Sequence, residues 1–115
     1  MTLFRLFLLI CLIMIVGYTL VTISNHGFDL MPVFFGDMAA MAWPGQFNLD
    51  FFTFLLLSGI WVSWRHQFSP AGLLLGLVAV LGGMLFLSIY LLAASFQTQG
   101  NVKALLLGEA RSRQP

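Results

Sequence analysis

The chain has 115 residues, of which 60% are hydrophobic and only 8% are charged. A soluble domain is typically about a quarter charged, so this composition excludes an ordinary soluble globule. The formal net charge of +1 gives no reason to expect a nucleic-acid partner or an acidic substrate. Because the apolar residues form long blocks, we expect an all-α membrane protein. It would have three transmembrane helices and a short interfacial helix between the first and the second.

The first apolar block runs from Leu6 to Ser24, and we place the first span at about residues 5–24. At ~1.5 Å per residue, such a helix is long enough for a hydrocarbon core of ~30 Å. Arg5 would suit the basic start of a signal peptide. However, the block is longer than the apolar region of a signal, and no small-residue cleavage site follows it. We therefore expect a retained helix, and we interpret its single cysteine, Cys11, as a packing residue.

A different composition follows the first span, because residues 28–43 contain glycine, proline and acids but no lysine or arginine. Glycine and proline break a continuous span, and acids discourage deep burial. The segment is also rich in Phe, Met and Trp, so we expect a short helix in the membrane interface, over about Met31 to Met41. Pro44 and Gly45 are expected to break the chain just before the second span.

The second apolar block follows Asp50. Its roughly 14 uncharged residues from Phe51 to Trp64 reach only about 21 Å, less than a core of ~30 Å. The helix must gain length at its start, so we place the span at about residues 47–65. Asp50 then lies in the first turns, where the helix dipole favours the ionised form, and Asn48 could cap the same turn. Two roles for Asp50 stay open: a helix-start carboxylate, or a bundle-facing acid that binds something.

The third span is placed at about residues 70–96, with Ser69 as its cap and Pro70 in its first turn. Four small residues recur on one face of this span: Gly72, Gly76, Ala79 and Gly83. Small residues let membrane helices approach closely. We interpret this face as a packing seam within the chain, with self-association or a partner as the alternative. Residues 97–115 turn polar and are predicted to form a polar or amphipathic C-terminal tail.

Three spans would place the two termini on opposite sides of a membrane. Arg5 and Arg65, the latter in the only short loop, favour the cytoplasmic side for the N-terminus and for that loop. The C-terminus is then predicted on the outer side. Counted by basic residues alone, this orientation leaves two inside and three outside, because the tail carries Lys103, Arg111 and Arg113.

Candidate functional side chains gather on the predicted outer side: His26, Asp29, Asn48 and Asp50. A cluster of His26, Asp29 and Asp50 could bind a cation or relay protons, although the spacing matches no known metal motif. His26 and His66 stand at opposite ends of spans, which excludes a bis-histidine haem and leaves His66 as a single axial ligand only as a weak alternative. No nucleophile and base form a pair. We therefore assign no catalytic residue, metal site or cofactor.

Two short motifs carry a family resemblance: H-G-F-D-L at residues 26–30 and F-N-L-D at residues 47–50. The pattern "SNHGFDLMPVFFGDM…FNLDFFTFLLLSGIWVSWR" is similar to small three-span bacterial membrane proteins of an uncharacterised family, a domain of unknown function. The resemblance covers about residues 5–96. It implies a three-span fold and a bacterial inner (cytoplasmic) membrane, and it implies no activity. In such a membrane the outer side predicted from Arg5 and Arg65 would make the C-terminus periplasmic. The tail departs from the shorter ends of that family.

Small size, the small-residue face and the lack of catalytic groups predict a non-enzymatic integral membrane protein. We expect an accessory or structural subunit that packs against a larger membrane complex. The alternative is a small oligomeric carrier, or a ligand- or cation-binding protein, that uses His26, Asp29 and Asp50. An enzyme acting on a lipid, quinone or carotenoid is a third hypothesis. The expected partners are the lipid bilayer and either a larger complex or a second copy, with no nucleic acid.

Overall fold

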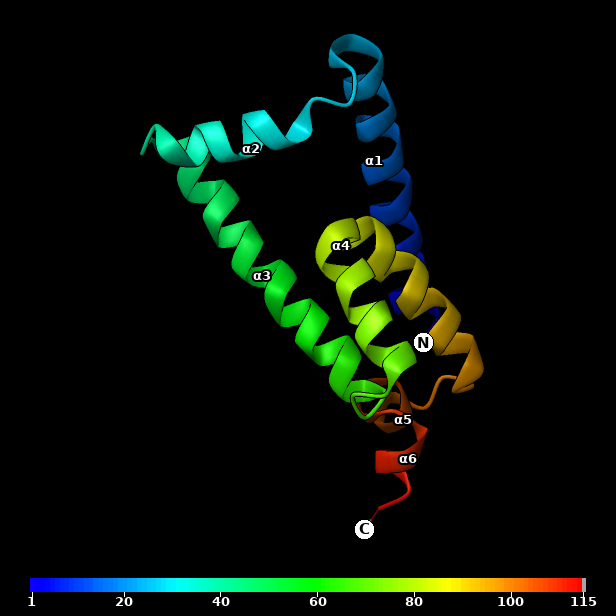
Figure 1. The fold of residues 1–115 in the computed structure, drawn as a ribbon. Coiled ribbons are helices and arrows are strands. Elements are labelled where there is room, and N and C mark those ends of the chain that lie inside the picture. Colours follow the sequence, from blue (N-terminus) through cyan, green and yellow to red (C-terminus); the bar gives the residue numbers. More distant parts are fainter. Residues whose placement is uncertain (115) are drawn as a thin grey trace.

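The computed structural model describes residues 1–114, and the secondary structure of this part of the chain is entirely helical. Three helices are long and apolar enough to cross a membrane: α1 (Thr2–His26), α3 (Trp43–Arg65) and α4 (Pro70–Gln97). A short helix, α2 (Leu30–Ala39), lies between the first two, and α5 (Val102–Leu107) and α6 (Glu109–Ser112) follow α4 (Figure 1). The predicted fold class, an all-α membrane protein with a short helix between its first two long helices, is confirmed.

Helix α1 is an almost uninterrupted apolar helix of 25 residues. It ends where Gly27 adopts a φ of 72°, and the N–H of Gly27 donates to the carbonyl of Ile23 at 2.7 Å. A positive φ of this kind is readily adopted only by glycine. Within α1, Leu8 alone is buried. Most of the remaining apolar side chains are exposed, an arrangement that a bilayer accommodates and water does not.

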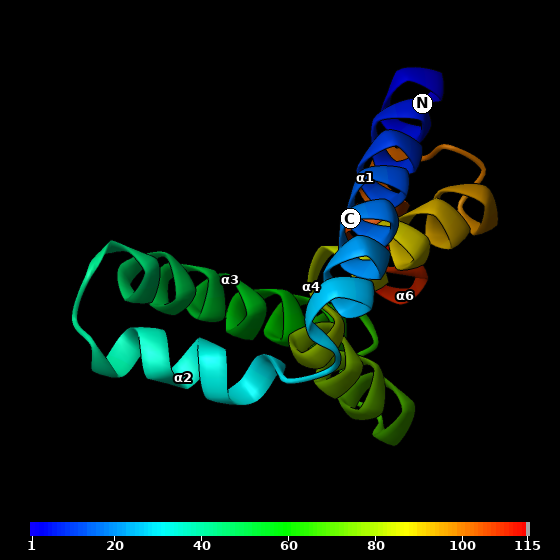
Figure 2. The same cartoon turned by 90° about the horizontal axis from the view of Figure 1, so that it is seen from above.

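Helix α2 folds back beside the first turns of α3, as seen from above in Figure 2. Gly45 lies buried at this crossing, where an added Cβ would collide with the backbone carbonyl of Asp37. Pro44 occupies the first turn of α3, a position where its missing N–H and fixed φ are tolerated. The prediction that Pro44 and Gly45 interrupt the chain is therefore wrong: they begin the helix, because their backbone requirements are met there.

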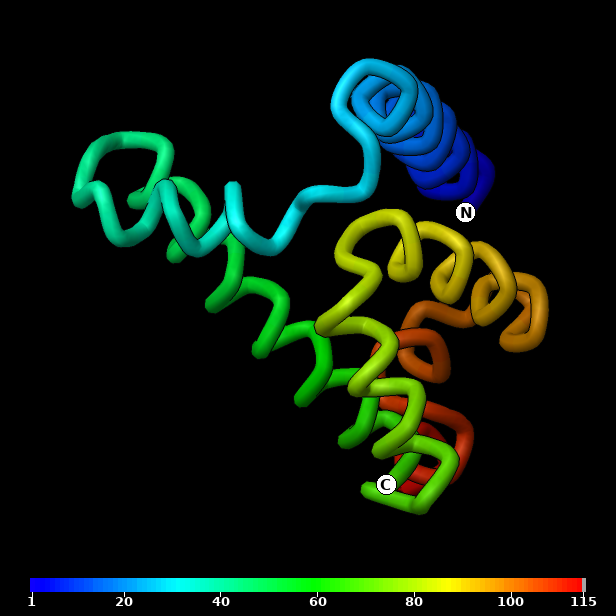
Figure 3. The backbone as a smooth tube through the Cα atoms, turned by 45° about the horizontal axis from the view of Figure 1, so that its top comes forward, coloured from blue at the N-terminus to red at the C-terminus, as the bar shows by residue number. Residues whose placement is uncertain are grey.

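Helix α4 starts as the sequence indicates, since the Ser69 hydroxyl accepts a hydrogen bond from the N–H of Gly72 at 3.1 Å. It does not run straight. Gly83 has φ 58° and ψ −142°, and the chain reverses direction there (Figures 1 and 3). We call residues 70–82 the first arm and residues 84–97 the second arm. The first arm packs on α3, and the second arm passes beside the first half of α1 (Figures 1 and 2).

Candidate functional site

The seam between α3 and the first arm is a direct contact of backbones. A Cβ added to Gly59 would lie 2.8 Å from the carbonyl oxygen of Gly76, and a Cβ added to Gly76 would lie 2.7 Å from that of Gly59. The Ser63 hydroxyl donates to the carbonyl of Gly72 at 3.1 Å. Of the four small residues singled out in the sequence, Gly72, Gly76 and Ala79 are buried in α4. The sequence analysis missed Gly59, the glycine on α3 that faces this seam.

The fourth small residue, Gly83, has a different place in the structure. It forms the reversal of α4, and an added Cβ would lie 3.2 Å from Cζ of Phe51 and 3.4 Å from Cδ2 of Leu55. The spacing argument assumed an unbroken helix, in which Gly83 continues the stripe of Gly72, Gly76 and Ala79. Position 83 requires glycine for two reasons: its φ is positive, and there is little room for a side chain.

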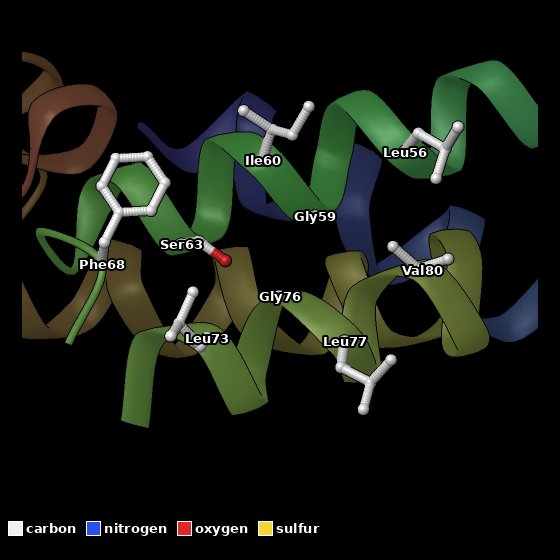
Figure 4. A pocket seen from close by; sticks show the side chains of 9 residues that line it. All are labelled: Leu56, Gly59, Ile60, Ser63, Phe68, Leu73, Gly76, Leu77 and Val80. Atoms are coloured by element: carbon white, nitrogen blue, oxygen red, sulfur yellow. The ribbon is translucent and has the colours of Figure 1, made fainter. Parts of the chain in front are cut away.

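A shallow apolar groove of about 380 Å³ runs along one side of this seam (Figure 4). Leu56 and Ile60 flank it from α3, and Leu73 and Leu77 from the first arm. Ser63 brings the only polar side chain to the lining, and its hydroxyl is already bonded to the backbone of the first arm. Such a groove suits an apolar chain and holds no group that could activate a substrate.

The four predicted cluster residues lie near the α2 end of the molecule, which we call the acidic end. His26 is the last residue of α1, and Asp29 immediately precedes α2. Both side chains are exposed, as is that of Asp50 on α3. Asn48 is half-buried and donates to the carbonyl of Phe34 at 3.1 Å. Among the described residues, no hydrogen bond or ion pair joins any two of the four.

The acidic side chain beside Asn48 is Asp37, which was not part of the predicted cluster: the Asn48 amide lies 3.5 Å from Oδ2 of Asp37. Asp37 belongs to α2, which packs across α3 at this point. The described part of the chain contains no group of three or more His, Cys, Asp or Glu side chains that could hold a metal ion. The cation-binding role of this end therefore stays a prediction.

Asp50 does not start its helix. Helix α3 begins at Trp43 with Ala42 as its N-cap, seven residues before Asp50. At ~1.5 Å per residue, Asp50 lies about 10 Å along the axis from the first residue of the helix. The interpretations of Asp50 as a helix-start carboxylate and of Asn48 as a cap are therefore wrong. Both assumed that Pro44 ends the preceding segment, whereas Pro44 sits within the first turn of α3.

The most extensive polar network lies at the opposite end, which we call the basic end, and centres on Arg65. Arg65 is only 9% exposed. Its Nε donates to the carbonyl of Leu105 at 2.7 Å, and its Nη1 donates to the hydroxyl of Tyr90 at 2.9 Å. The carbonyls of Leu105 and Ala104 belong to the last turn of α5, where helical carbonyls carry partial negative charge, and the Ala104 carbonyl also accepts from the N–H of Gly108 at 2.9 Å. The buried guanidinium is thus stabilised by oriented dipoles.

Tyr90 links Arg65 to His66, because its hydroxyl also lies 2.6 Å from Nε2 of His66. Arginine can only donate, so the Tyr90 oxygen accepts from Arg65. A neutral His66 that carries its proton on Nδ1 would accept the Tyr90 proton at Nε2. Burial, and then the charge of Arg65, lower the pKa of His66 below its ordinary value, which favours the same neutral form.

The tail closes over this network. The Trp61 indole donates from Nε1 to the carbonyl of Leu106 at 3.1 Å. The Arg111 guanidinium donates to the carbonyl of Trp64 and lies 4.1 Å from the centroid of the Trp64 ring. Ala104 and Leu105 are buried. The predicted tail is therefore packed on the end of α3 as far as Arg111, while Arg113 and Gln114 are exposed and Pro115 lies outside the described residues.

The start of α1 joins the basic end through Arg5. Nε of Arg5 donates to the Ser95 hydroxyl at 3.0 Å, and Nη2 donates to the Ser95 carbonyl at 2.9 Å. The same guanidinium lies 3.8 Å from the centroid of the Phe96 ring. Five basic residues make up the Lys and Arg of the chain, and all of them belong to the basic end: Arg5, Arg65, Lys103, Arg111 and Arg113. Three of the four acids are at the acidic end, and Glu109 is the exception.

Comparison with protein-family models, with curated proteins and with solved structures gives no match for this chain. The functional argument therefore depends on the geometry of the two ends. A signal for the basic end was present in the sequence, since Tyr90 and Ser95 interrupt an otherwise apolar block. Their partners could not be inferred, because pairing Ser95 with Arg5 requires the second arm to return to the start of α1.

Proposed function

We propose that this chain is a small, non-enzymatic integral membrane protein that packs against a larger membrane complex as an accessory or structural subunit. The observation that supports this proposal most directly is that little of α1 is buried within this chain. In its most apolar window only 6% of the residues are buried within this chain, against 17% for α3 and 22% for α4. The half of α1 beyond the second arm presents mostly exposed apolar side chains, including Tyr18, which is 79% exposed.

The use of the buried polar groups supports the non-enzymatic part of the proposal. Arg65 donates to two backbone carbonyls and to Tyr90. Ser63 donates to the backbone of the first arm, and Arg5 donates to Ser95. Groups that bind or transform a substrate normally converge on a cavity with hydrogen-bonding capacity left for it. Here these donors are directed at other parts of the chain.

The bacterial inner membrane is the proposed location, with the N-terminus in the cytoplasm. Arg5 and Arg65 flank the two apolar helices α1 and α3 at the same end, and basic residues near short loops favour the cytoplasmic side. The family resemblance of the H-G-F-D-L and F-N-L-D motifs supports a bacterial source. The acidic end, with α2, would then face the periplasm.

A small oligomeric carrier or cation-binding protein is the second candidate. It is favoured by the exposure of His26, Asp29 and Asp50 at one end of the molecule. This candidate requires several copies, because three helices with one bent back enclose no path through a membrane.

Copurification in mild detergent separates the two candidates. The tagged chain is expected to bring down one defined larger membrane protein in constant ratio. Tyr18→Ala with Val21→Ala on the isolated half of α1 should abolish that association. Leu74→Ala on the first arm is the matched control, since Leu74 is 63% exposed and Val21 is 60% exposed. A stable homo-oligomer without such a partner would contradict the proposal and support the carrier.

A further inference from the structure

We infer that α4 does not cross the membrane: it enters and leaves on one side as a re-entrant helical hairpin, so that both ends of the chain lie on the same face. This assigns two membrane-spanning helices, α1 and α3, instead of three. The inference concerns the topology of the chain and holds whichever partner the protein has.

The length of the arms is the first argument. Each arm has only about 13 or 14 residues, which at ~1.5 Å per residue reaches about 20 Å. A helix needs about 20 residues to cross a hydrocarbon core of ~30 Å. Neither arm alone is long enough. The full 28 residues would be sufficient only if the helix were straight, and the backbone at Gly83 is not helical.

The reversal at Gly83 is half-buried and lies against α3. Broken backbone at membrane depth is tolerated where other parts of the protein cover it. Phe51 and Leu55 of α3 lie against Gly83, so that even a Cβ there would touch both side chains. Gly83 itself adopts a φ of 58° that other residues rarely take. The bend thus has both the residue and the cover that a re-entrant turn needs.

The return of the second arm to its starting level is the third argument. A straight helix of 28 residues would separate Pro70 from Gln97 by about 40 Å. Instead, Tyr90 of the second arm bonds to Arg65 and His66, which precede the first arm. A polar cavity of about 450 Å³ is lined jointly by residues from both bases of the hairpin and from the tail: Arg65, His66, Gln97, Thr98, Gly108 and Glu109.

The position of the N-terminus is the fourth argument, because Met1 lies beside the residues that follow the second arm. A Cβ added to Gly100 would lie 3.5 Å from Cβ of Met1 and 3.6 Å from its Cγ. Arg5 is bonded to Ser95 within the second arm. Thus the start of α1, the loop at Arg65 and the tail form one face of the molecule (Figure 1).

The charge distribution agrees with this face being cytoplasmic. With three straight spans, the five basic residues divide into two inside and three outside, against the positive-inside rule. With α4 re-entrant, all five lie on one side. The opposite face carries Asp29, Asp37 and Asp50 and no lysine or arginine. The positive-inside rule then favours a single orientation, with both termini in the cytoplasm, and no basic residue on the other face opposes it.

Cysteine accessibility tests the inference directly. In a Cys11→Ala background, single cysteines are introduced at Thr2, Phe28 and Arg113, three exposed positions at the N-terminus, the turn after α1 and the tail. Intact bacterial spheroplasts are treated with a membrane-impermeant maleimide. We expect labelling of Phe28→Cys alone, with Thr2→Cys and Arg113→Cys labelled only after the membranes are opened.

Two other outcomes are informative. Labelling of Arg113→Cys together with Phe28→Cys in intact spheroplasts would overturn the re-entrant hairpin. Labelling of Thr2→Cys and Arg113→Cys while Phe28→Cys stays protected would support the hairpin and overturn only the cytoplasmic N-terminus of the proposed function. The two proposals therefore fail in different ways.

A cross-link checks the same point within the folded protein. Met1→Cys, with one methionine added ahead of it for initiation, is paired with Gly100→Cys in the Cys11→Ala background. The predicted Cβ separation of 3.5 Å falls in the range of ~3.5–4.5 Å found in disulfides. Mild oxidation in membranes should remove both thiols from reaction with a PEG-maleimide. The control pair Phe28→Cys with Gly100→Cys should keep both thiols, and two remaining thiols in the first pair would contradict the inference.

Discussion

The basic end and the acidic end use their polar side chains in opposite ways. At the basic end, Arg5, Arg65 and Tyr90 donate or accept hydrogen bonds that join α1, α3, α4 and the tail. At the acidic end, His26 and Asp50 are exposed and bond to no other side chain among the described residues. The difference teaches that polar residues at one membrane edge can be structural while those at the other stay available to solvent or to a ligand.

The largest loss of stability is expected for Gly76→Leu. This substitution disrupts the contact between α3 and the first arm, next to the basic end. The backbone of Gly76 touches that of Gly59, so a leucine must push the first arm away from α3. Overpacking costs about 1–3 kcal/mol and more where backbone is the obstacle. Thermal unfolding in detergent measures the change. Gly17→Leu is the control, because a Cβ at Gly17 meets nothing within 4 Å. Equal midpoints for both variants would show that the seam is dispensable.

A smaller but still clear loss is expected for Gly83→Ala. The new Cβ disfavours this combination of φ 58° and ψ −142° by roughly 1–3 kcal/mol and presses on Phe51. Straightening α4 to relieve this would separate Tyr90 from Arg65. The cross-link between Met1→Cys and Gly100→Cys should therefore form more slowly in this variant. Gly36→Ala, in open space on α2, should leave its rate unchanged.

Tyr90→Phe is expected to weaken the basic end without changing its packing. The variant removes a hydroxyl that accepts from Arg65 and lies 2.6 Å from His66. Hydrogen bonds to charged groups contribute about 1.5–3 kcal/mol. We expect faster proteolysis between α4 and α5 together with a lower unfolding midpoint. Tyr18→Phe serves as the control, since the Tyr18 ring is 79% exposed on α1.

The pH dependence of stability should be modest and should arise from His66. Its pKa is lower in the folded protein than its ordinary value of about 6.5. The unfolded chain then binds more protons between these two values, so stability rises with pH in that window. On acidification, stability is expected to begin falling near pH 6.5 and to level off below the folded-state pKa. His66→Gln should flatten this profile, whereas His26→Gln should retain it. Besides Arg65, the charged side chain that lines the same cavity as His66 is Glu109.

The smallest effect on stability is expected for Asp50→Asn at the acidic end. The Asp50 side chain is exposed and makes no hydrogen bond among the described residues, and the Thr53 hydroxyl donates to the Asp50 backbone carbonyl at 2.6 Å. Surface substitutions of this kind change stability by less than about 0.5 kcal/mol. If Asp50→Asn lowered stability as much as Tyr90→Phe, the claim that polar side chains are structural only at the basic end would be contradicted. A functional defect with an unchanged midpoint would support the carrier hypothesis.

Sequence reasoning succeeded where local chemistry decides. The apolar blocks predicted the three long helices, and Ser69 and Pro70 marked the start of α4 correctly. It failed at Pro44, because proline both breaks helices and begins them, and only the packing of Gly45 against α2 distinguishes the two. The network around Arg65 could not be found from spacing, since Arg65, Tyr90 and Leu105 are separated by 15 residues or more.

By itself the sequence determined that this is a helical membrane protein with three apolar helices and a short one between the first two. The reason is that apolar runs of this length can satisfy their backbone groups in a bilayer only as helices. Tertiary structure alone decided the path of α4. Glycine at position 83 is compatible with a straight helix as well as with the positive φ of 58° found here, so its local preference is weak. The turn is selected because α3 covers the bend, while Arg5 and Arg65 hold the returning arm through Ser95 and Tyr90.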